Sequence, residues 1–175
     1  AFLQLASQDL PQLSLMQRLA RVSDSLHQVL DLDYATSLEL LRQLAPRLNS
    51  RFVCIFLPHY VASFGLDDFE RSMQALKYFT GFGSSEFAVR HFLRQDCQRT
   101  LAVLQEWATD SDEHVRRLAS EGSRPRLPWS FRLEQLQADP QLAAPILERL
   151  RNDPSLYVRK SVANHLNDIT KEHPQ

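Results

Sequence analysis

Apolar residues recur at helical spacing along most of the chain. The clearest stripe advances in alternating steps of four and three residues and comprises Leu15, Leu19, Val22, Leu26 and Val29. Stripes of the same kind occupy residues 38–44, 69–79, 101–108, 142–150 and 158–169. No stretch alternates convincingly with a period of two, although residues 51–57 have a strand-like composition. The pattern therefore predicts an all-α fold built from amphipathic helices.

Capping residues and prolines mark the ends of these helices. Asp139-Pro140 and Asp153-Pro154 each place a capping aspartate before a proline that suits the first helical position. The acidic turn at residues 110–113 predicts another helix start, and Gly122 predicts where that helix stops. Residues 122–130 contain two prolines, two arginines and a tryptophan. This segment cannot be helical throughout, because proline breaks a helix interior.

A weak internal repeat indicates how the helices are arranged. Val115-Arg116-Arg117 follows an acidic turn, and Val158-Arg159-Lys160 repeats the pattern 43 residues later, with Val89-Arg90-His91 as a degenerate copy. Helix pairs of about 40 residues with this signature are typical of HEAT-like repeats. We therefore predict a HEAT-like α-solenoid of stacked antiparallel helix pairs, forming one domain over residues 1–175, with a concave face for a partner.

The charge is unevenly distributed. The formal net charge is −1, which gives no global signature of nucleic-acid binding. Within residues 116–132, however, five arginines stand against one acid, a local net charge of five minus one, or +4. This segment is the best candidate for contact with phosphates.

Other classes of site find little support. Cys54 and Cys97 form neither a disulfide framework nor a zinc motif, and the six histidines are scattered. We read both cysteines as reduced thiols of a cytosolic protein and expect no metal and no cofactor. The longest apolar run, residues 52–57, is too short to cross a membrane, so we expect no membrane association.

Two helices place charged residues on equivalent faces. Arg117 and Glu121 are four residues apart, and Lys160, Asn164 and Asp168 step by four in the later repeat. At 100° per residue, both sets lie roughly opposite the apolar stripe. They form either a binding face or an ordinary solvated face, whose ion pairs contribute only about 0.3–0.5 kcal/mol.

Three stretches resemble a known family. Residues 112–129, with the sequence Arg-Arg-Leu-Ala-Ser-Glu-Gly-Ser-Arg-Pro-Arg-Leu-Pro-Trp from Arg116 onward, are similar to the signature of the AlkC-type alkylbase DNA glycosylases. These enzymes are relatives of the AlkD-type enzymes with HEAT-like repeats. Residues 84–90 and 162–174 resemble the preceding and following repeats. Some members carry an Ig-like domain after the repeats, which these residues lack, and the chain begins without Met, so we expect missing residues before Ala1.

The resemblance implies a function and a set of residues. It implies hydrolytic removal of positively charged bases, notably 3-methyladenine and 3-methylcytosine, from double-stranded DNA, without a deep base-flipping pocket or a lysine nucleophile. The matching carboxylates are Glu86, Glu121 and Asp168, the matching aromatic residue is Trp129, and Arg117 matches a basic residue near the lesion.

These residues suit the chemistry that such a reaction needs. Carboxylates stabilise the positive charge that develops on the sugar and can position a water molecule. We assign the water to Asp168 and the sugar or base to Glu121, whose alternative is an ion pair with Arg117. For Glu86 the alternative is a first-turn acid that favours the helix dipole. Trp129 either contacts the lesion, since aromatic faces attract cations, or anchors its loop in the core.

Phosphate contacts are expected from basic residues around the same segment. Arg124 and Arg126 are the first candidates, and the weaker ones are Arg90, Arg94, Arg132 and Lys160.

Two other functions remain open. One is a HEAT-like module that binds damaged or unusual DNA without cutting it, and the other is a protein-binding helical scaffold. Acids on a DNA-facing surface weaken phosphate binding, so their presence favours the enzyme. A scaffold predicts an exposed apolar groove, where this sequence has arginines and acids. We expect a monomer in the bacterial cytosol or nucleoid.

Overall fold

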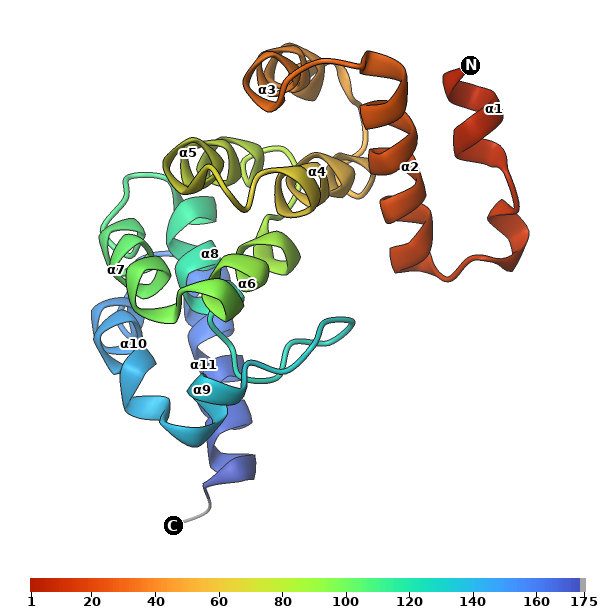
Figure 1. Cartoon of the computed structure of the whole chain (residues 1–175). Coiled ribbons are helices and arrows are strands. Elements are labelled where there is room, and N and C mark those ends of the chain that lie inside the picture. Colours follow the sequence, from red (N-terminus) through yellow and green to blue (C-terminus); the bar gives the residue numbers. More distant parts are fainter. Residues whose placement is uncertain (174–175) are drawn as a thin grey trace. The chain divides into compact units, whose positions relative to one another are not determined.

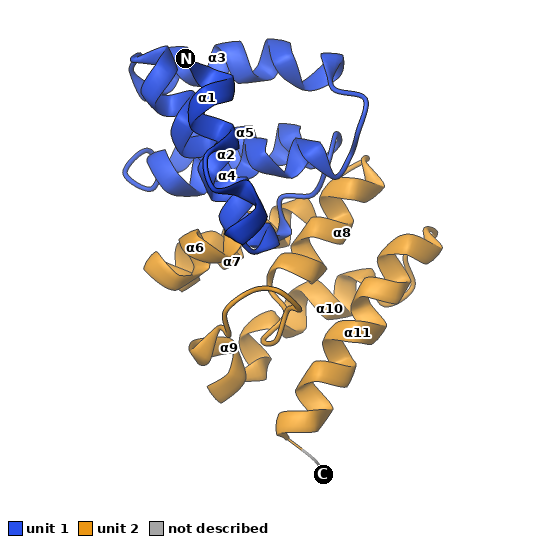
Figure 2. Ribbon diagram, turned by 90° about the vertical axis from the view of Figure 1, so that its right-hand side faces the viewer, with its two compact units in different colours: residues 1–88 blue, residues 89–175 orange. Residues whose placement is uncertain are grey.

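The computed structural model describes residues 1–173, and Pro174 of the motif lies outside that part. These residues form eleven α-helices and four short 3₁₀ helices with no strand, which confirms the predicted all-α fold (Figure 1). Two compact units share the chain, one over residues 1–88 and the other from residue 89 onward (Figure 2). Residues 51–57, despite their strand-like composition, include a 3₁₀ turn at Val53–Ile55 and the start of a helix.

Unit 1 contains the first five helices. They are α1 (Phe2–Ser7), α2 (Leu15–Leu30), α3 (Tyr34–Leu44), α4 (Phe56–Phe64) and α5 (Phe69–Phe79). Helix α4 is the most buried of them, because it packs against both α2 and α5. Its Leu57, Tyr60 and Val61 are fully buried. Ser14 caps α2 in a reciprocal capping box with Gln17, which satisfies two backbone donors at the helix start.

Unit 2 begins inside α6 (Glu86–Gln95). It continues through α7 (Cys97–Trp107), α8 (Glu113–Gly122), α9 (Glu134–Ala138), α10 (Ala144–Leu150) and α11 (Leu156–Glu172). Helix α8 packs against α7, α10 and α11 and so lies at the centre of this unit. Leu104, Leu118, Ile146 and Val158 are among its fully buried side chains. Trp107 of α7 is also buried.

The internal repeat is visible in the hydrogen bonds of α8 and α11. Arg116 Nη1 donates to the carbonyls of Asp110 and Ser111, six and five residues earlier. Arg159 Nη1 donates to the carbonyls of Asp153 and Pro154 at the same two separations. Val115 and Val158, the residues before these arginines, are both buried. The predicted repeat therefore corresponds to two equivalent turn-and-helix motifs, and their helices α8 and α11 are in direct contact.

The predicted helix starts agree with the structure in two of three cases, and α8 ends at Gly122 as predicted. Asp112 and Asp139 cap their helices, accepting bonds from the backbone N–H groups of His114 and Gln141. The prediction for Asp153 was wrong, since α11 begins at Leu156 with Ser155 as its N-cap. Asp153 is buried instead, and its carboxylate pairs with Arg116 at 2.7 Å.

The segment between α8 and α9 is irregular, as its prolines predicted. We call residues 123–133 the arginine-rich loop. Figure 1 shows it extending away from the helices of its unit. Its base is closed by a bond from the Leu133 N–H to the Pro125 carbonyl, 3.1 Å, and Leu127 and Leu133 are buried. The middle of the loop is therefore presented to solvent on a fixed base.

Within residues 1–173, no helix is both long enough and apolar enough to cross a bilayer.

Candidate functional site: a carboxylate pair bridged by arginine

The central feature of unit 2 is a polar cluster between α8 and α11. Glu121, near the end of α8, and Asp168, in α11, both bind the guanidinium of Arg124 from the arginine-rich loop. Arg124 Nη1 lies 2.5 Å from Glu121 Oε1, and Arg124 Nε lies 2.7 Å from Asp168 Oδ2. The guanidinium of Arg124 therefore bridges the two carboxylates.

Each oxygen of the Glu121 carboxylate has a partner. Oε1 binds Arg124 and is also 3.5 Å from Nη2 of Arg117. Oε2 accepts a 2.6 Å hydrogen bond from the hydroxyl of Ser161, which lies 3.1 Å from the Ser120 hydroxyl. A buried carboxylate is stable only when its oxygens are satisfied in this way. The geometry thus fixes the orientation of Glu121 from both sides.

His165 supports the same cluster from α11. Its Nδ1 lies 3.0 Å from the carbonyl oxygen of Ser120 and donates to it. Burial lowers the pKa of His165 to about 4, although the bond to Ser120 and the charge of Asp168 oppose this effect. The imidazole is therefore neutral at physiological pH, and it adds no positive charge beside the two carboxylates.

The burial of the carboxylates corrects the expected helix faces. Glu121 and Asp168 are each only 5% exposed, whereas Lys160 and Asn164 are exposed. The buried side of α11 consists of Val158, Ser161, Val162, His165 and Asp168. Leu166, which the apolar stripe included, is 47% exposed. The polar residues of α11 face α8 because residues of α8 and of the arginine-rich loop bind them there. The hydrophobic pattern of one helix cannot reveal partners on another element.

Arg117 lies at the edge of this cluster. Its side chain is 15% exposed, and its guanidinium is 5.2 Å from the centre of the Tyr157 ring. The predicted pairing with Glu121 at four-residue spacing is present, although it is the longer of the two contacts made by arginines with that carboxylate.

Trp129 lies on the exposed part of the arginine-rich loop. The residue is 70% exposed, so the reading in which it anchors the loop in the core was wrong. Its φ of 64° is in the left-handed region, where a residue other than glycine has a cost of about 1–2 kcal/mol. Such outliers cluster at ligand-binding sites.

Arg90 has a structural position that corrects its expected role. It is fully buried, and its guanidinium donates to the carbonyls of Gly122, Arg124 and Phe131. With its guanidinium engaged by three carbonyls and no exposed surface, Arg90 has a structural role in this unit. Arg90 instead ties the arginine-rich loop to α6, and Arg94 adds to this by stacking 3.4 Å from the centre of the Phe131 ring.

The other candidate cations differ in exposure. Arg124 is only 8% exposed, and its guanidinium is bound by Glu121 and Asp168. Arg126 is partly exposed and pairs with Glu172 at 2.7 Å. Arg132 and Lys160 are exposed.

Glu86 belongs to unit 1, at the first residue of α6. The hydroxyl of Ser84 donates to its carboxylate at 2.7 Å, and an acid in the first turn also favours the helix dipole.

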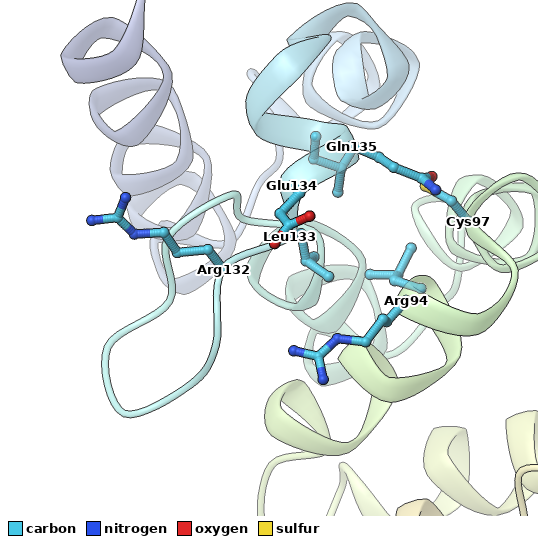
Figure 3. A pocket seen from close by; sticks show the side chains of 8 residues that line it. Arg94, Cys97, Arg132, Leu133, Glu134 and Gln135 are labelled. Carbon is cyan, nitrogen blue, oxygen red and sulfur yellow. The ribbon is translucent and has the colours of Figure 1, made fainter.

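A separate hollow of about 250 Å³ lies between α6, α7 and the start of α9. Leu93, Arg94 and Cys97 form one side, and residues 132–136 form the other. In Figure 3 the Arg132 side chain extends away from the other labelled residues. Burial raises the pKa of the Cys97 thiol, which makes it a poor nucleophile. None of the cluster residues lines this hollow.

Sequence reasoning missed Ser161 and His165. A serine and a histidine in a helix give no signal by themselves, because their importance comes from contacts with Ser120 and Glu121 some 40 residues earlier. Only the spacing of three to four residues among Ser161, His165 and Asp168 could have suggested a shared face.

Unit 2 therefore combines helical repeats with two buried carboxylates that are bridged by an arginine from the loop exposing Trp129. A family model described as "DNA alkylation repair enzyme" matches residues 35–175, and the chain belongs to that family. The chain is 71% identical to the Pseudomonas fluorescens alkylpurine DNA glycosylase AlkC, solved bound to DNA containing an abasic site analog. That match has a TM-score of 0.97 and covers 99% of this chain and 48% of the other. The helical-repeat fold is thereby confirmed.

A second relative is also matched over about half of its own length. The "Uncharacterized protein YhaZ" of Bacillus subtilis (strain 168) is 50% identical over 167 residues, which are 95% of this chain and 46% of that protein. The chain thus spans about half the length of both proteins.

Proposed function

We propose that the chain is a monofunctional DNA glycosylase that hydrolyses the N-glycosidic bond of cationic alkylated bases in double-stranded DNA. The substrates we propose are 3-methyladenine and, as a second candidate, 3-methylcytosine. The observation that carries the proposal is the pair of carboxylates, Glu121 and Asp168, held by an arginine of the loop that exposes Trp129. The high identity to a named alkylpurine DNA glycosylase supports it.

The reaction makes particular demands. When the bond between C1′ and the base nitrogen breaks, its electron pair stays with the base and positive charge develops on the sugar. A cationic base leaves as a neutral molecule and needs no general acid. Water then adds to C1′ and loses a proton. The protein therefore needs groups that stabilise positive charge and position a water molecule, and carboxylates do both.

Glu121 and Asp168 suit different parts of this task. In the described part of the chain, Arg124 donates its hydrogen bond to Oδ2 of Asp168. We therefore assign Oδ1 of Asp168 to accept a hydrogen bond from the attacking water. Glu121, whose orientation is fixed, faces the sugar or base in our proposal. A carboxylate about 4 Å from a unit positive charge contributes about 4 kcal/mol at an effective dielectric of 20. Every 1.36 kcal/mol felt only in the transition state gives about tenfold in rate.

The remaining residues would bind the DNA around the lesion. The exposed ring of Trp129 offers an aromatic face to a cationic base or to deoxyribose, and Arg117 lies next to Glu121. We retain Glu86 as a third carboxylate on the strength of its motif alone. Arg126, Arg132 and Lys160 are the proposed phosphate contacts, because they keep exposed surface. We propose that the protein acts as a monomer in the bacterial cytosol, where the chromosome is.

One observation favours a second candidate function. Both carboxylates are already paired with arginine and have little exposed surface, as expected of a purely structural network. A module that binds damaged or unusual DNA without cutting it would have such a network together with the same exposed cations.

Release of free base separates the two functions. The chain is incubated with methylated duplex DNA, and released bases are separated by chromatography while strand integrity is followed on a gel. The proposal expects free 3-methyladenine and an intact strand that breaks only after alkali. Salt-dependent DNA binding with no base released would instead identify the non-catalytic module. Strand breakage without alkali would contradict a monofunctional mechanism.

A further inference from the structure

Arg124 occupies an unusual place for an arginine of an exposed loop. It follows Gly122 by two residues in a segment with a local excess of arginine, where contact with DNA phosphate is the natural expectation. In the structure its side chain turns inward and is 10% exposed. The loop thus sends one arginine into the protein between α8 and α11, while Trp129 of the same loop stays outside.

The backbone of Arg124 is held as firmly as its side chain. Its N–H lies 3.4 Å from the carbonyl of Glu121, and its own carbonyl accepts a hydrogen bond from the buried guanidinium of Arg90. The guanidinium of Arg124 then binds Glu121 through Nη1 and Asp168 through Nε. Because both ends of the residue are fixed, the position of the head group is set before any DNA arrives.

The charges of the cluster explain why a cation is required there. Glu121 and Asp168 would repel each other if no cation lay between them, and a cation near a carboxylate favours its charged form. Burial opposes the charge of Arg124, but the hydrogen bond to Asp168 and the charge of Glu121 outweigh it and raise the pKa of the guanidinium. The groups facing the pair are Arg117 from α8, Arg124 from the loop and the neutral His165 from α11.

We infer that Arg124 is a positioning residue that keeps Glu121 and Asp168 ionised and correctly spaced for excision, and that its side chain does not bind DNA phosphate. The planar guanidinium is what allows this, since its Nε and Nη1 point to different carboxylates. Ser161 completes the arrangement by holding the other oxygen of Glu121. This inference rests on the proposed glycosylase function.

The first test measures how DNA affinity depends on salt. A lost phosphate contact lowers the slope of log affinity against log salt by about 0.9. The inference expects Arg124→Gln to leave this slope unchanged, whereas the control Arg132→Gln, at an exposed loop arginine, should lower it. A slope lowered to the same extent in both variants would overturn the inference.

The second test measures single-turnover excision of 3-methyladenine against pH. Arg124→Lys keeps one charge but cannot bind both carboxylates in the same way. We expect its rate at neutral pH to fall at least tenfold and the acid limb of its pH profile to move to higher pH. A purely structural arginine would leave that limb in place, so an unmoved limb in a folded variant overturns the inference.

Folding of the variants needs its own safeguard, because removing Arg124 leaves two buried charges. If Arg124→Gln unfolds, the salt slope is measured for Arg124→Gln combined with Asp168→Asn and is compared with that of Asp168→Asn alone. An equal slope supports the inference, and a lower one overturns it. If the wild-type chain releases no base, the proposed function fails and this inference fails with it. If wild type is active but the Arg124 tests fail, only the inference falls.

Discussion

The imidazole of His165 illustrates how a single buried residue links stability to pH. Burial holds its pKa at about 4 in the folded protein, against an ordinary value of 6.5. Between these two values the unfolded chain carries a proton that the folded chain does not. The stability associated with the neutral ring is therefore complete above about pH 6.5 and is lost as the pH falls toward 4.

A substitution isolates this contribution. Asparagine at position 165 can still donate a hydrogen bond to the Ser120 carbonyl, but it does not titrate. From pH 7 to pH 4 we expect wild type to lose about 3 kcal/mol more unfolding free energy than His165→Asn, because one pKa unit corresponds to about 1.36 kcal/mol. Urea unfolding at several pH values measures the difference. Parallel curves for the two proteins would show that His165 titrates normally.

At this scale the sequence identified the carboxylates but not their surroundings. Glu121 and Asp168 were found because they lie in recognisable motifs, and the roles assigned to them remain proposals. Their burial was not predicted, since four-residue spacing alone does not distinguish a solvated face from a polar contact with another helix. The burial of Arg124 was not predicted for the same reason, because its partner Asp168 lies 44 residues away.

Among the elements, α6 and α8 meet at a glycine. A Cβ added to Gly122 would lie 2.4 Å from Cγ1 of Val89, closer than real side chains approach. Val89 is fully buried and cannot move into solvent. Glycine therefore serves close helix contact here as well as ending α8.

We expect Gly122→Ala to destabilise unit 2 by about 1–3 kcal/mol, the usual cost of overpacking a core. The helical preference of alanine offsets at most about 1 kcal/mol of this. Thermal or urea unfolding measures the loss. Combining the substitution with Val89→Ala should cost less than the sum of the two single changes, because the clash is removed. Strict additivity would argue against this contact.

Helix α8 is also joined to the turn before α11 by an ion pair. Arg116 binds both carboxylate oxygens of Asp153, at 2.7 and 3.1 Å. Burial raises the pKa of Asp153, but the bonds from Arg116 and from the Ser155 N–H outweigh that effect and lower it.

Removal of the Asp153 carboxylate should be costly because the guanidinium of Arg116 then loses the negative charge that neutralises it. We expect Asp153→Asn to lower the unfolding free energy by about 3–5 kcal/mol. The exposed pair Glu148–Arg151 provides the control, since Glu148→Gln should change stability by less than about 1 kcal/mol. Similar losses in both variants would contradict the special role of the Arg116–Asp153 pair.

Prediction of the elements succeeded where the determinants were local. The helix start within residues 110–113 and the cap at Asp139 were correct, because the capping contacts of Asp112 and Asp139 each span only two residues. Asp153 has the same aspartate-proline signal, yet its carboxylate binds an arginine 37 residues earlier in addition to the Ser155 N–H. Leu166 was placed in the core by its spacing, although the buried positions of α11 follow the polar partners on α8.

For the molecule as a whole, the net charge of −1 means that DNA binding must come from a few exposed cations. Each phosphate contact contributes about 0.9 to the slope of log affinity against log salt. Arg132 and Lys160 are the most exposed of the proposed contacts. The double variant Arg132→Gln, Lys160→Gln should therefore lower the slope by about 1.8.

Two exposed arginines, Arg149 in α10 and Arg151 at its C-cap, provide a matched control for that measurement. Arg149→Gln combined with Arg151→Gln removes the same charge from a surface that we do not assign to DNA. Fluorescence anisotropy over a range of salt concentrations gives both slopes. Equal decreases in the two double variants would show that the attraction is a diffuse property of the surface and not a set of contacts.

The central claim, that two carboxylates stabilise positive charge during excision, is tested most directly by single-turnover release of 3-methyladenine. Wild type is compared with Glu121→Gln, Asp168→Asn and the control Glu148→Gln, with DNA affinity measured in parallel. We predict that both site variants bind DNA but excise at least tenfold more slowly, whereas the control retains the wild-type rate. Wild-type rates in Glu121→Gln and Asp168→Asn would contradict the account, because the negative charge of the pair would then be unnecessary.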